Sequence, residues 1–360
     1  MKVSREAVLA YRIAVQGLRR DVTSPQALAI IGLGVQNTPP GSARLACAAR
    51  LPSTPTDFTG LRIAWTYRVS PHLHHEADLP GVAAALWPAS EPDAVSRLNW
   101  PGPRLAGTGR SATEVIEQAT DAMRDVLTEP MTKGAASAAI TERIDESLTM
   151  WCKACQSTHI YDSLFRLAAG LAGAWLDTEA KATLITPTPG WSRPAHDPVK
   201  RAELIRACLR FLGPARPADV ADFLSVNKAE LAKNWPGELV EVDVDGTKGF
   251  FPREDVAALR KPPEPPHVRL LPPGDPYLQT RDRAMIVPDA TARKVLWGVL
   301  GNPGAVLVDG EIVGAWRAKA VGKRRLEFRL EPFGEPLPGD LAEEAQRVAA
   351  ARGIAEAIIA

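Results

Sequence analysis

The sequence has few cysteines, no long apolar run and almost no net charge. Its four cysteines, at positions 47, 152, 155 and 208, are too few and too unevenly spaced among 360 residues for a disulfide framework, which favours a reducing compartment. The formal net charge is +1. No overall field therefore attracts an acidic polymer, and affinity for nucleic acid has to come from local clusters of Lys and Arg.

The chain also has no segment typical of a membrane span or a secretory signal. The longest apolar stretch, 164–176, contains Arg166 and is shorter than the about 20 residues that cross a bilayer. The first fifteen residues carry Lys2, Arg5, Glu6 and Arg12 without an uninterrupted apolar core. We therefore expect a soluble, cytoplasmic protein that does not associate with membranes.

Helix and strand patterns predict an α+β fold of tandem winged-helix units with a small β-meander at the C-terminus. The clearest unit is 191–262, where three expected helices (197–212, 217–224 and 228–235) precede a hairpin with Asp245-Gly246 at its turn. The predicted division is a first winged helix with an active-site loop (1–105), a second helical or winged-helix unit (106–190), the third winged helix (191–262) and a hairpin, meander and helix (263–360).

Other elements are expected from apolar periodicity and turn residues. Asp309-Gly310 predicts a second hairpin, and 320–323 a further turn that completes the meander. The remaining expected elements are helices at 4–18, 26–34, 42–51, 113–127, 141–148, 161–176 and 341–359, and a strand at 61–67.

A short polar tip separates two apolar runs near the N-terminus. Gln36, Asn37 and Thr38 follow the first run, and Pro40-Gly41-Ser42 suits the start of a helix. Asn and Thr are common in capping loops, which is one interpretation. The other is that the tip presents its side chains into a cleft.

Two groups of residues could bind a metal ion. Cys152-x-x-Cys155-x-x-x-His159 has a spacing that lets two thiolates and an imidazole converge, with Cys208, His196 or a carboxylate as a fourth zinc ligand. The alternative is a small-residue turn with buried cysteines. His72 and His74 would share one face of a strand, but no acidic or cysteine partner lies at a suggestive spacing.

Basic residues alternate with Leu326 and Phe328 along the C-terminal meander, so one face of it is expected to be cationic. Such a face could contact phosphates, or it could protect a sheet edge from aggregation. We favour phosphate contact and name as its DNA-binding residues Arg317, Lys319, Lys323, Arg324 and Arg325.

Five motifs are spread over nearly the whole chain. They are LGVQNTPPGSA at 33–43, RVSPHLH at 68–74, WCKACQSTHIYDSLFR at 151–166, LLPPGDPYLQTRDR at 270–283 and VLVDGEIVGAWR at 306–317. Together, and in this order, they resemble the AlkZ-like (YcaQ-like) winged-helix DNA glycosylase family.

This resemblance implies tandem winged helices with a DNA-binding surface and the removal of alkylated or cross-linked purines. In the family a Gln-x-Gln or Gln-x-Asp pair occupies the polar tip; here Gln36 matches the first member and Thr38 stands at the second position. It also implies that Arg68 and His72 lie at a DNA-facing edge. The site so implied has Gln36 and Thr38 as its catalytic residues, and Asp275 and Tyr277 as DNA-binding residues that line it.

The function expected from the sequence is that of a monofunctional DNA glycosylase, in which water attacks C1′ of the damaged nucleotide. The alternative is a non-catalytic winged-helix protein that binds or regulates DNA. The expected partner is double-stranded DNA, and the chain is taken to be a monomer. No cofactor is expected, with structural zinc at Cys152, Cys155 and His159 left open. An enzyme for another class of substrate is the least favoured hypothesis, because the sequence contains no recognisable nucleophile–base set and no phosphate-binding loop.

Overall fold

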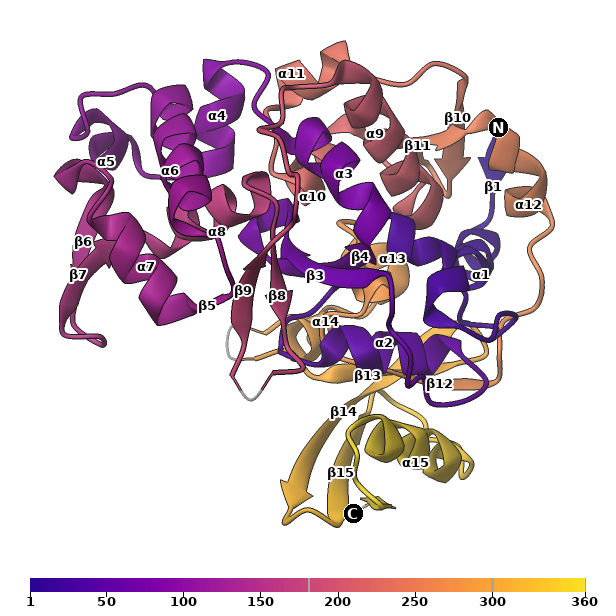
Figure 1. The fold of residues 1–360 in the computed structure, drawn as a ribbon. Helices are drawn as coiled ribbons and strands as arrows, with labels where there is room; N and C mark the ends of the chain where they lie inside the picture. Colours follow the sequence, from indigo (N-terminus) through magenta and orange to yellow (C-terminus); the bar gives the residue numbers. More distant parts are fainter. Residues whose placement is uncertain (181, 299–300, 360) are drawn as a thin grey trace. The chain divides into compact units, whose positions relative to one another are not determined.

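The fold is known from a computed structural model, which describes residues 1–180, 182–298 and 301–359 (Figure 1). It is a mixed α+β structure with two compact units. Unit 1 comprises Met1–Leu61, Arg206–Asp219 and Gly237–Ala360; unit 2 comprises Arg62–Ile205 and Val220–Pro236. The four-part division expected from the sequence stays a prediction.

Unit 1 begins with a short strand and an amphipathic helix. Ser4 caps α1, since its Oγ accepts a hydrogen bond from the Ala7 N–H at 3.3 Å. Strand β1 pairs in parallel with β10, whose hairpin with β11 turns at Asp245 and Gly246 with φ of 49° and 88°, as a type I′ turn requires. These elements are β1 (Lys2–Val3), α1 (Arg5–Val15), β10 (Leu239–Val244), β11 (Thr247–Pro252) and α12 (Val256–Arg260).

A five-stranded sheet in the order β12-β13-β14-β15-β16 forms the C-terminal part of unit 1. Leu45 of α2 and Leu341 of α15 share a buried cluster with Trp316 and Phe328 on this sheet, so both helices pack on it. The elements are α2 (Ser42–Arg50), β12 (Val268–Leu271), α13 (Arg283–Ile286), α14 (Ala290–Leu296), β13 (Gly304–Val308), β14 (Glu311–Val321), β15 (Arg325–Pro332), α15 (Leu341–Ala351) and β16 (Glu356–Ile359).

In unit 2 the strands of the main sheet follow the order β4-β3-β8-β9-β5. Its core contains Ile116 and Met123 of α6, Phe165 of α8 and Trp65 of β3. The elements are β3 (Leu61–Trp65), β4 (Pro71–His75), α3 (Leu79–Leu86), α4 (Glu91–Leu98), α5 (Gly102–Ala106), α6 (Ala112–Val126), β5 (Met131–Thr132), α7 (Lys133–Thr141), β6 (Thr149–Cys152), β7 (Ser157–Ile160), α8 (Asp162–Leu171), β8 (Ala174–Asp177), β9 (Leu184–Pro187) and α11 (Lys228–Lys233).

Helices α9 (Pro198–Leu212) and α10 (Pro217–Leu224) contain the boundaries between the two units. Together with α11, β10 and β11 they follow the order of three helices and a hairpin that the sequence predicted for 191–262. Among the described residues, every helix is too short or too polar to cross a bilayer.

Several expected helices differ from those observed. The helix predicted at 26–34 is two 3₁₀ turns, η1 (Pro25–Ala27) and η2 (Ala29–Gly32). The one at 161–176 ends at Leu171, because Gly173 adopts φ +76° and the chain then pairs as β8. The one at 341–359 likewise ends at Ala351, before β16 joins the sheet. In place of 141–148 the structure has α7 and the 3₁₀ turn η5 (Glu146–Leu148).

Candidate active-site corner and its surroundings

The polar tip predicted at residues 36–38 forms a hydrogen-bonded corner before α2. It begins with the two-residue strand β2 (Val35–Gln36). Asn37 is buried, and its Oδ1 accepts hydrogen bonds from the N–H groups of Gly41 at 2.9 Å and Ala43 at 3.2 Å, so Asn37 caps the helix. Ser42 Oγ donates to the Gln36 carbonyl oxygen at 3.1 Å. The capping interpretation therefore applies to Asn37, while Gln36 is half-buried and Thr38 is exposed.

The loop after β12 lies directly against this corner. Gly274 has φ +76°, and a Cβ built on it would lie 2.4 Å from the Thr38 carbonyl oxygen and 3.9 Å from Gln36 Nε2. Only glycine combines this backbone conformation with so close an approach. Gly274 thus fixes how closely the loop contacts the two predicted catalytic residues, and the sequence alone did not predict this role.

A buried ion pair joins the same loop to the end of α2. Arg50 donates from Nη1 to Asp275 Oδ2 at 2.7 Å and from Nη2 to Oδ1 at 2.8 Å, and neither side chain is exposed. Arg50 also donates to the Gln16 and Ala46 carbonyl oxygens, while Asp275 accepts from the Tyr277 N–H. The two-bond geometry and these additional hydrogen bonds offset the cost of removing both charges from water.

Helix α1 contributes a second buried guanidinium. Arg12 donates to both carboxylate oxygens of Asp282, at 3.1 and 2.6 Å, and from Nε to the Gly213 carbonyl oxygen at 3.0 Å. One helical turn later, Gln16 Nε2 donates to the Phe211 carbonyl oxygen. Two buried arginines thus hold the loop after β12 and its continuation against α1 and α2.

Asp275 and Tyr277 were predicted to contact DNA, but both are fully buried. Asp275 is occupied by Arg50, and burial raises the pKa of Tyr277, which keeps its hydroxyl neutral. We therefore assign both to positioning of the corner, which differs from the DNA contact expected from the sequence.

Arg68 and His72 lie in unit 2. Arg68 is half-buried, and it donates to the Phe223 carbonyl oxygen at 2.6 Å with its guanidinium 4.6 Å from the Phe223 ring centroid. His72 is buried, with Nδ1 2.9 Å from the Ser70 carbonyl oxygen. Desolvation, together with Arg68 and His74, lowers the pKa of His72 well below its usual value. His72 is therefore a neutral interior group, and its buried ring does not offer a surface contact.

The basic residues of the meander are all exposed, and the predicted alternation is present. Arg317 pairs directly with Arg329, and Lys319 with Glu327, on one face of β14 and β15; Ala318 and Phe328 lie on the other. Arg317 and Arg329 also border a hollow of about 120 Å³. Like charges directly opposite each other destabilise a sheet, so this face is not optimised for stability.

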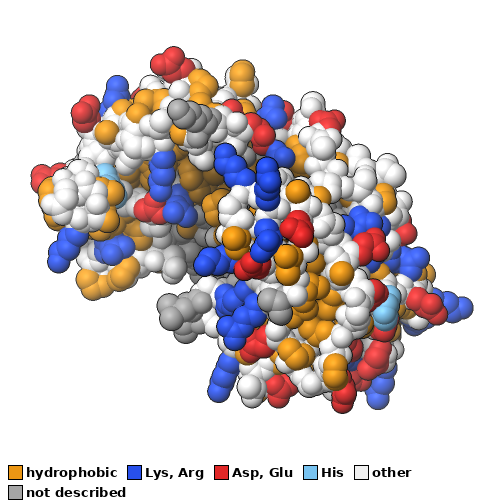
Figure 2. Space-filling model, turned by 90° about the horizontal axis from the view of Figure 1, so that it is seen from below, with side chains coloured by type: hydrophobic (Ala, Val, Ile, Leu, Met, Phe, Trp, Pro, Cys, Tyr) orange, Lys and Arg blue, Asp and Glu red, His pale blue; other side chains and the backbone are white. Residues whose placement is uncertain are grey.

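Cationic and anionic side chains are mixed on the face of the molecule drawn in Figure 2. Lys and Arg side chains are numerous there, and Asp and Glu side chains lie among them. This agrees with the near-zero net charge and leaves the meander face as a local cationic feature.

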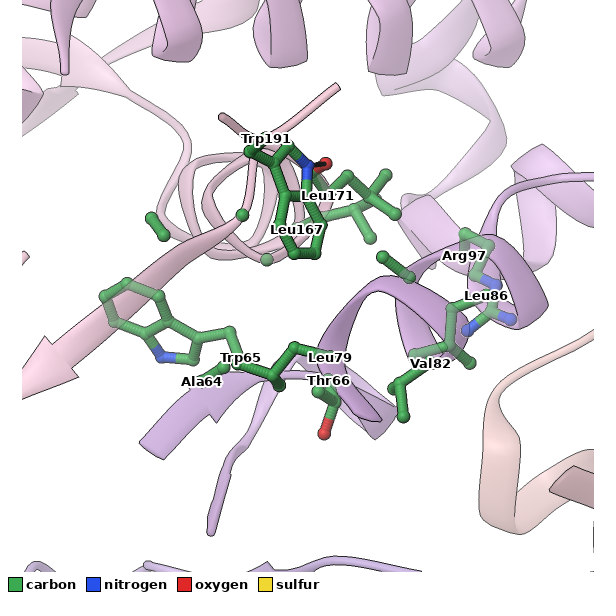
Figure 3. A pocket seen from close by; sticks show the side chains of 14 residues that line it. Ala64, Trp65, Thr66, Leu79, Val82, Leu86, Arg97, Leu167, Leu171 and Trp191 are labelled. Atoms are coloured by element: carbon green, nitrogen blue, oxygen red, sulfur yellow. Dashed lines mark hydrogen bonds between the residues drawn. The ribbon is translucent and has the colours of Figure 1, made fainter. Parts of the chain in front are cut away.

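A second cavity, inside unit 2, is apolar and too small for a nucleobase. The indole of Trp191 and Leu167 lie on one side of it, and Leu79 and Val82 on the other (Figure 3). Its volume of about 20 Å³ is sufficient for a water molecule. Burial lowers the pKa of Arg97, which lines one end, to about 9.

One protein family matches most of this sequence. The sequence model described as "DNA glycosylase AlkZ-like" matches residues 33–351. The chain belongs to the AlkZ-like DNA glycosylase family. The matched range includes the corner, the loop after β12 and the cationic meander face.

A sequence relative and a solved structure, both from Streptomyces sahachiroi, illustrate the similarity to AlkZ-like proteins. An interstrand DNA cross-link repair glycosylase is 33% identical over 164 residues, a match that spans 42% of this chain and only 42% of that relative. The structure of the DNA glycosylase AlkZ is similar over 100% of both chains, with a TM-score of 0.76 and 21% identity. At that identity, the structural similarity establishes a shared fold.

This AlkZ-like chain also brings together the predicted metal-binding residues. The possible ligand atoms of Cys152, Cys155 and His159 all lie within 4.8 Å of one another. Hydrogen bonds from the N–H groups of Cys155 and Ala154, with His159 nearby, lower the pKa of Cys152 to about 7. The pKa of Cys155 is raised by its hydrogen bond with Cys152. The proposed fourth ligand Cys208 is buried in α9 and is not part of this cluster.

Proposed function

We propose that this chain is a tandem winged-helix DNA glycosylase that removes an alkylated or cross-linked purine by hydrolysis. The observation that carries the proposal is the corner itself, where Gln36 is half-buried and Thr38 exposed on backbone held by Asn37, Ser42 and Gly274. Such preorganisation is what a water-positioning site requires, because small displacements of the reacting groups cost rate.

Hydrolysis of the glycosidic bond of an alkylated purine needs little assistance from the protein. An N7-alkylated purine carries a positive charge, so the C1′–N bond breaks with its electron pair leaving on a base that departs neutral. The oxygen of a water molecule forms the new bond to C1′, and a water proton is released. The Gln36 carboxamide oxygen accepts a hydrogen bond from that water, and the Thr38 hydroxyl can accept a second. Neither group brings a charge to the developing oxocarbenium ion.

Contact with double-stranded DNA is assigned to the cationic meander face. Arg317, Lys319 and Arg325 are exposed on a sheet whose opposite face is apolar core, so they are presented to solvent in a fixed arrangement. Lys323 and Arg324 extend the charge at the turn. Phosphate contact by such residues orients a duplex without reading its sequence.

A non-catalytic DNA-binding protein is the second candidate. The observation that favours it is Thr38, which stands where the family pair has Gln or Asp and supplies no charge. In that case the corner keeps its geometry but the protein no longer hydrolyses the glycosidic bond.

One experiment distinguishes the two candidates. A duplex with a single N7-methylguanine is incubated with the protein, and half of each sample is treated with hot alkali to cleave abasic sites. A gel shift on the other half measures binding. Alkali-sensitive product above that of the same modified duplex incubated without protein supports the glycosylase. Binding without product supports the second candidate, and absence of binding at low salt contradicts both.

A further inference from the structure

Strands β6 and β7 form a two-stranded sheet of their own, which extends to one side of unit 2 in Figure 1. Cys152 pairs with Ser157 at the end of the ladder, and His159 pairs with Met150. Since residues two apart on a strand share a face, Cys152 and His159 lie diagonally on the same face of the hairpin. The sheet thus places a thiol and an imidazole together.

The loop brings the second thiol to the same place. Residues 153–156 reverse the chain, with Gln156 in the left-handed region at φ 53° and its Nε2 donating to the Lys153 carbonyl oxygen at 2.6 Å. The N–H groups of Ala154 and Cys155 donate to Cys152 Sγ. This folds Cys155 back toward Cys152.

The orientation of His159 is also fixed. Its Nδ1 lies 2.7 Å from the Ile160 carbonyl oxygen, and because a carbonyl oxygen only accepts, Nδ1 carries the proton. The other nitrogen, Nε2, is then the lone-pair donor. Metal-ligating histidines are commonly oriented by a carbonyl in this way.

We propose that Cys152, Cys155 and His159 bind a zinc ion at the tip of the β6–β7 hairpin, with a water molecule as the fourth ligand. Zinc takes sulfur at about 2.3 Å and nitrogen at about 2.0 Å, which places tetrahedral ligands about 3.3–3.8 Å apart. The observed atoms lie within 4.8 Å, so small side-chain rotations are sufficient. Two thiolates neutralise the ion, and sulfur ligands exclude calcium and magnesium.

The metal has a physical role in this position. A two-stranded hairpin is at best marginally stable alone. At its base, the Ile160 N–H donates to Thr141 Oγ1 at 3.0 Å, whereas residues 153–158 at its tip are exposed. A zinc ion that joins both strands and the loop holds the tip in the way that Thr141 holds the base.

The test uses the full chain without a histidine tag, purified under reducing conditions and supplied with zinc before gel filtration. We expect about one zinc per chain by mass spectrometry of the metal. His159→Asn and Cys155→Ser should each lower this to about a tenth or less. His267→Asn is the matched control, because His267 is an exposed histidine beside two carboxylates, Asp309 and Asp340, and should not change the zinc content.

Limited proteolysis is a second measurement, and it does not depend on whether zinc is retained during purification. Lys153 is exposed within the loop, so trypsin should cleave after it rapidly in the chelator-treated protein and slowly once zinc is restored. In His159→Asn, zinc should give no protection. A wild-type protein that retains about a tenth of a zinc or less, or in which Cys152 and Cys155 form a disulfide that excludes zinc under these reducing conditions, would overturn the proposal.

Discussion

Arg50 and Asp275, 225 residues apart in the chain, form an ion pair with two hydrogen bonds and no solvent exposure. Through it the end of α2 holds the loop whose Gly274 contacts the Gln36–Thr38 corner. The geometry of the proposed active site therefore depends on a charge pair that takes no part in the chemistry.

Asp275→Asn should destabilise the protein strongly. It leaves the Arg50 charge buried without its counter-ion, and breaking such a pair costs about 3–5 kcal/mol. Urea unfolding followed by circular dichroism measures the loss. Asp309→Asn, which removes a carboxylate from a solvent-exposed pair with His267, is the control and should have no measurable effect. Equal effects of the two changes would mean that the buried pair has no special importance.

Gly274→Ala should reduce excision through the shape of the corner. Its Cβ would collide with the Thr38 carbonyl oxygen, whereas a Cβ at Gly246, with a similar φ of +88°, meets none of the described residues within 4 Å. Gly246→Ala therefore measures the backbone strain alone, about 1–2 kcal/mol. We expect Gly274→Ala to lose more stability than this control and to lose excision, while Gly246→Ala retains excision. If both variants lose the same stability and both retain excision, the contact between Gly274 and the corner does not determine activity.

The double change Arg317→Ala and Arg329→Ala should weaken duplex binding without harming the fold. Arg329 lies opposite Arg317 on the cationic face, so the double change removes two charges from the proposed phosphate-contact surface and lowers the slope of log affinity against log salt by about 2. Because the two charges face each other, stability should stay unchanged or rise slightly. Arg253→Ala with Arg260→Ala removes the same charge from other exposed positions. An equal loss of affinity in this control would indicate only a general effect of charge.

Two buried histidines predict acid sensitivity. Desolvation lowers the pKa of His74 to about 3 and that of His72 well below its ordinary value, so both are neutral when folded. In the unfolded chain both histidines have the ordinary pKa of about 6.5 and bind protons below it. The stability that comes from burying them neutral is therefore fully present above that pH and is lost as the pH falls below it. Unfolding curves measured from pH 7 down to pH 5 should show the loss.

His74→Gln should flatten this dependence, because the substituted side chain does not titrate. His267→Asn serves as the control with the opposite sign, since Asp309 raises the pKa of His267 and any stabilisation by it is lost as the pH rises. A wild-type slope that His74→Gln leaves unchanged would place the acid sensitivity elsewhere.

Thr38→Gln should raise the rate of excision. A carboxamide reaches further than the hydroxyl and restores the second member of the family pair, so the water gains a better-placed acceptor. Thr38 is exposed, and the change should fit without altering stability. Single-turnover rates on an alkylated duplex make the comparison. An unchanged rate would indicate that residue 38 does not contact the water.

The sequence predicted local features well where local chemistry determines them. Asp245-Gly246 and Asp309-Gly310 both form the expected two-residue turns, with positive φ at each residue. The alternation that makes one face of β14 and β15 cationic is present as well. Turn chemistry and a period of two residues are sufficient for such elements.

Elements that depend on distant partners were not predictable in this way. Strand β16 forms because it pairs in parallel with β15, and β8 because it pairs with β3, although both segments have helix-favouring residues. The roles of Arg50 and Gly274 could not be inferred for the same reason, since each depends on contacts more than 200 residues away in the chain.

The most direct test of the account is Gln36→Ala, compared with Gln26→Ala, which changes another half-buried glutamine nearby. Single-turnover excision and duplex affinity are measured for both. We predict that Gln36→Ala abolishes excision and leaves affinity and stability close to wild type, while Gln26→Ala retains excision. Undiminished excision by Gln36→Ala, or a parallel loss of excision, binding and stability, would contradict the claim that Gln36 positions the attacking water.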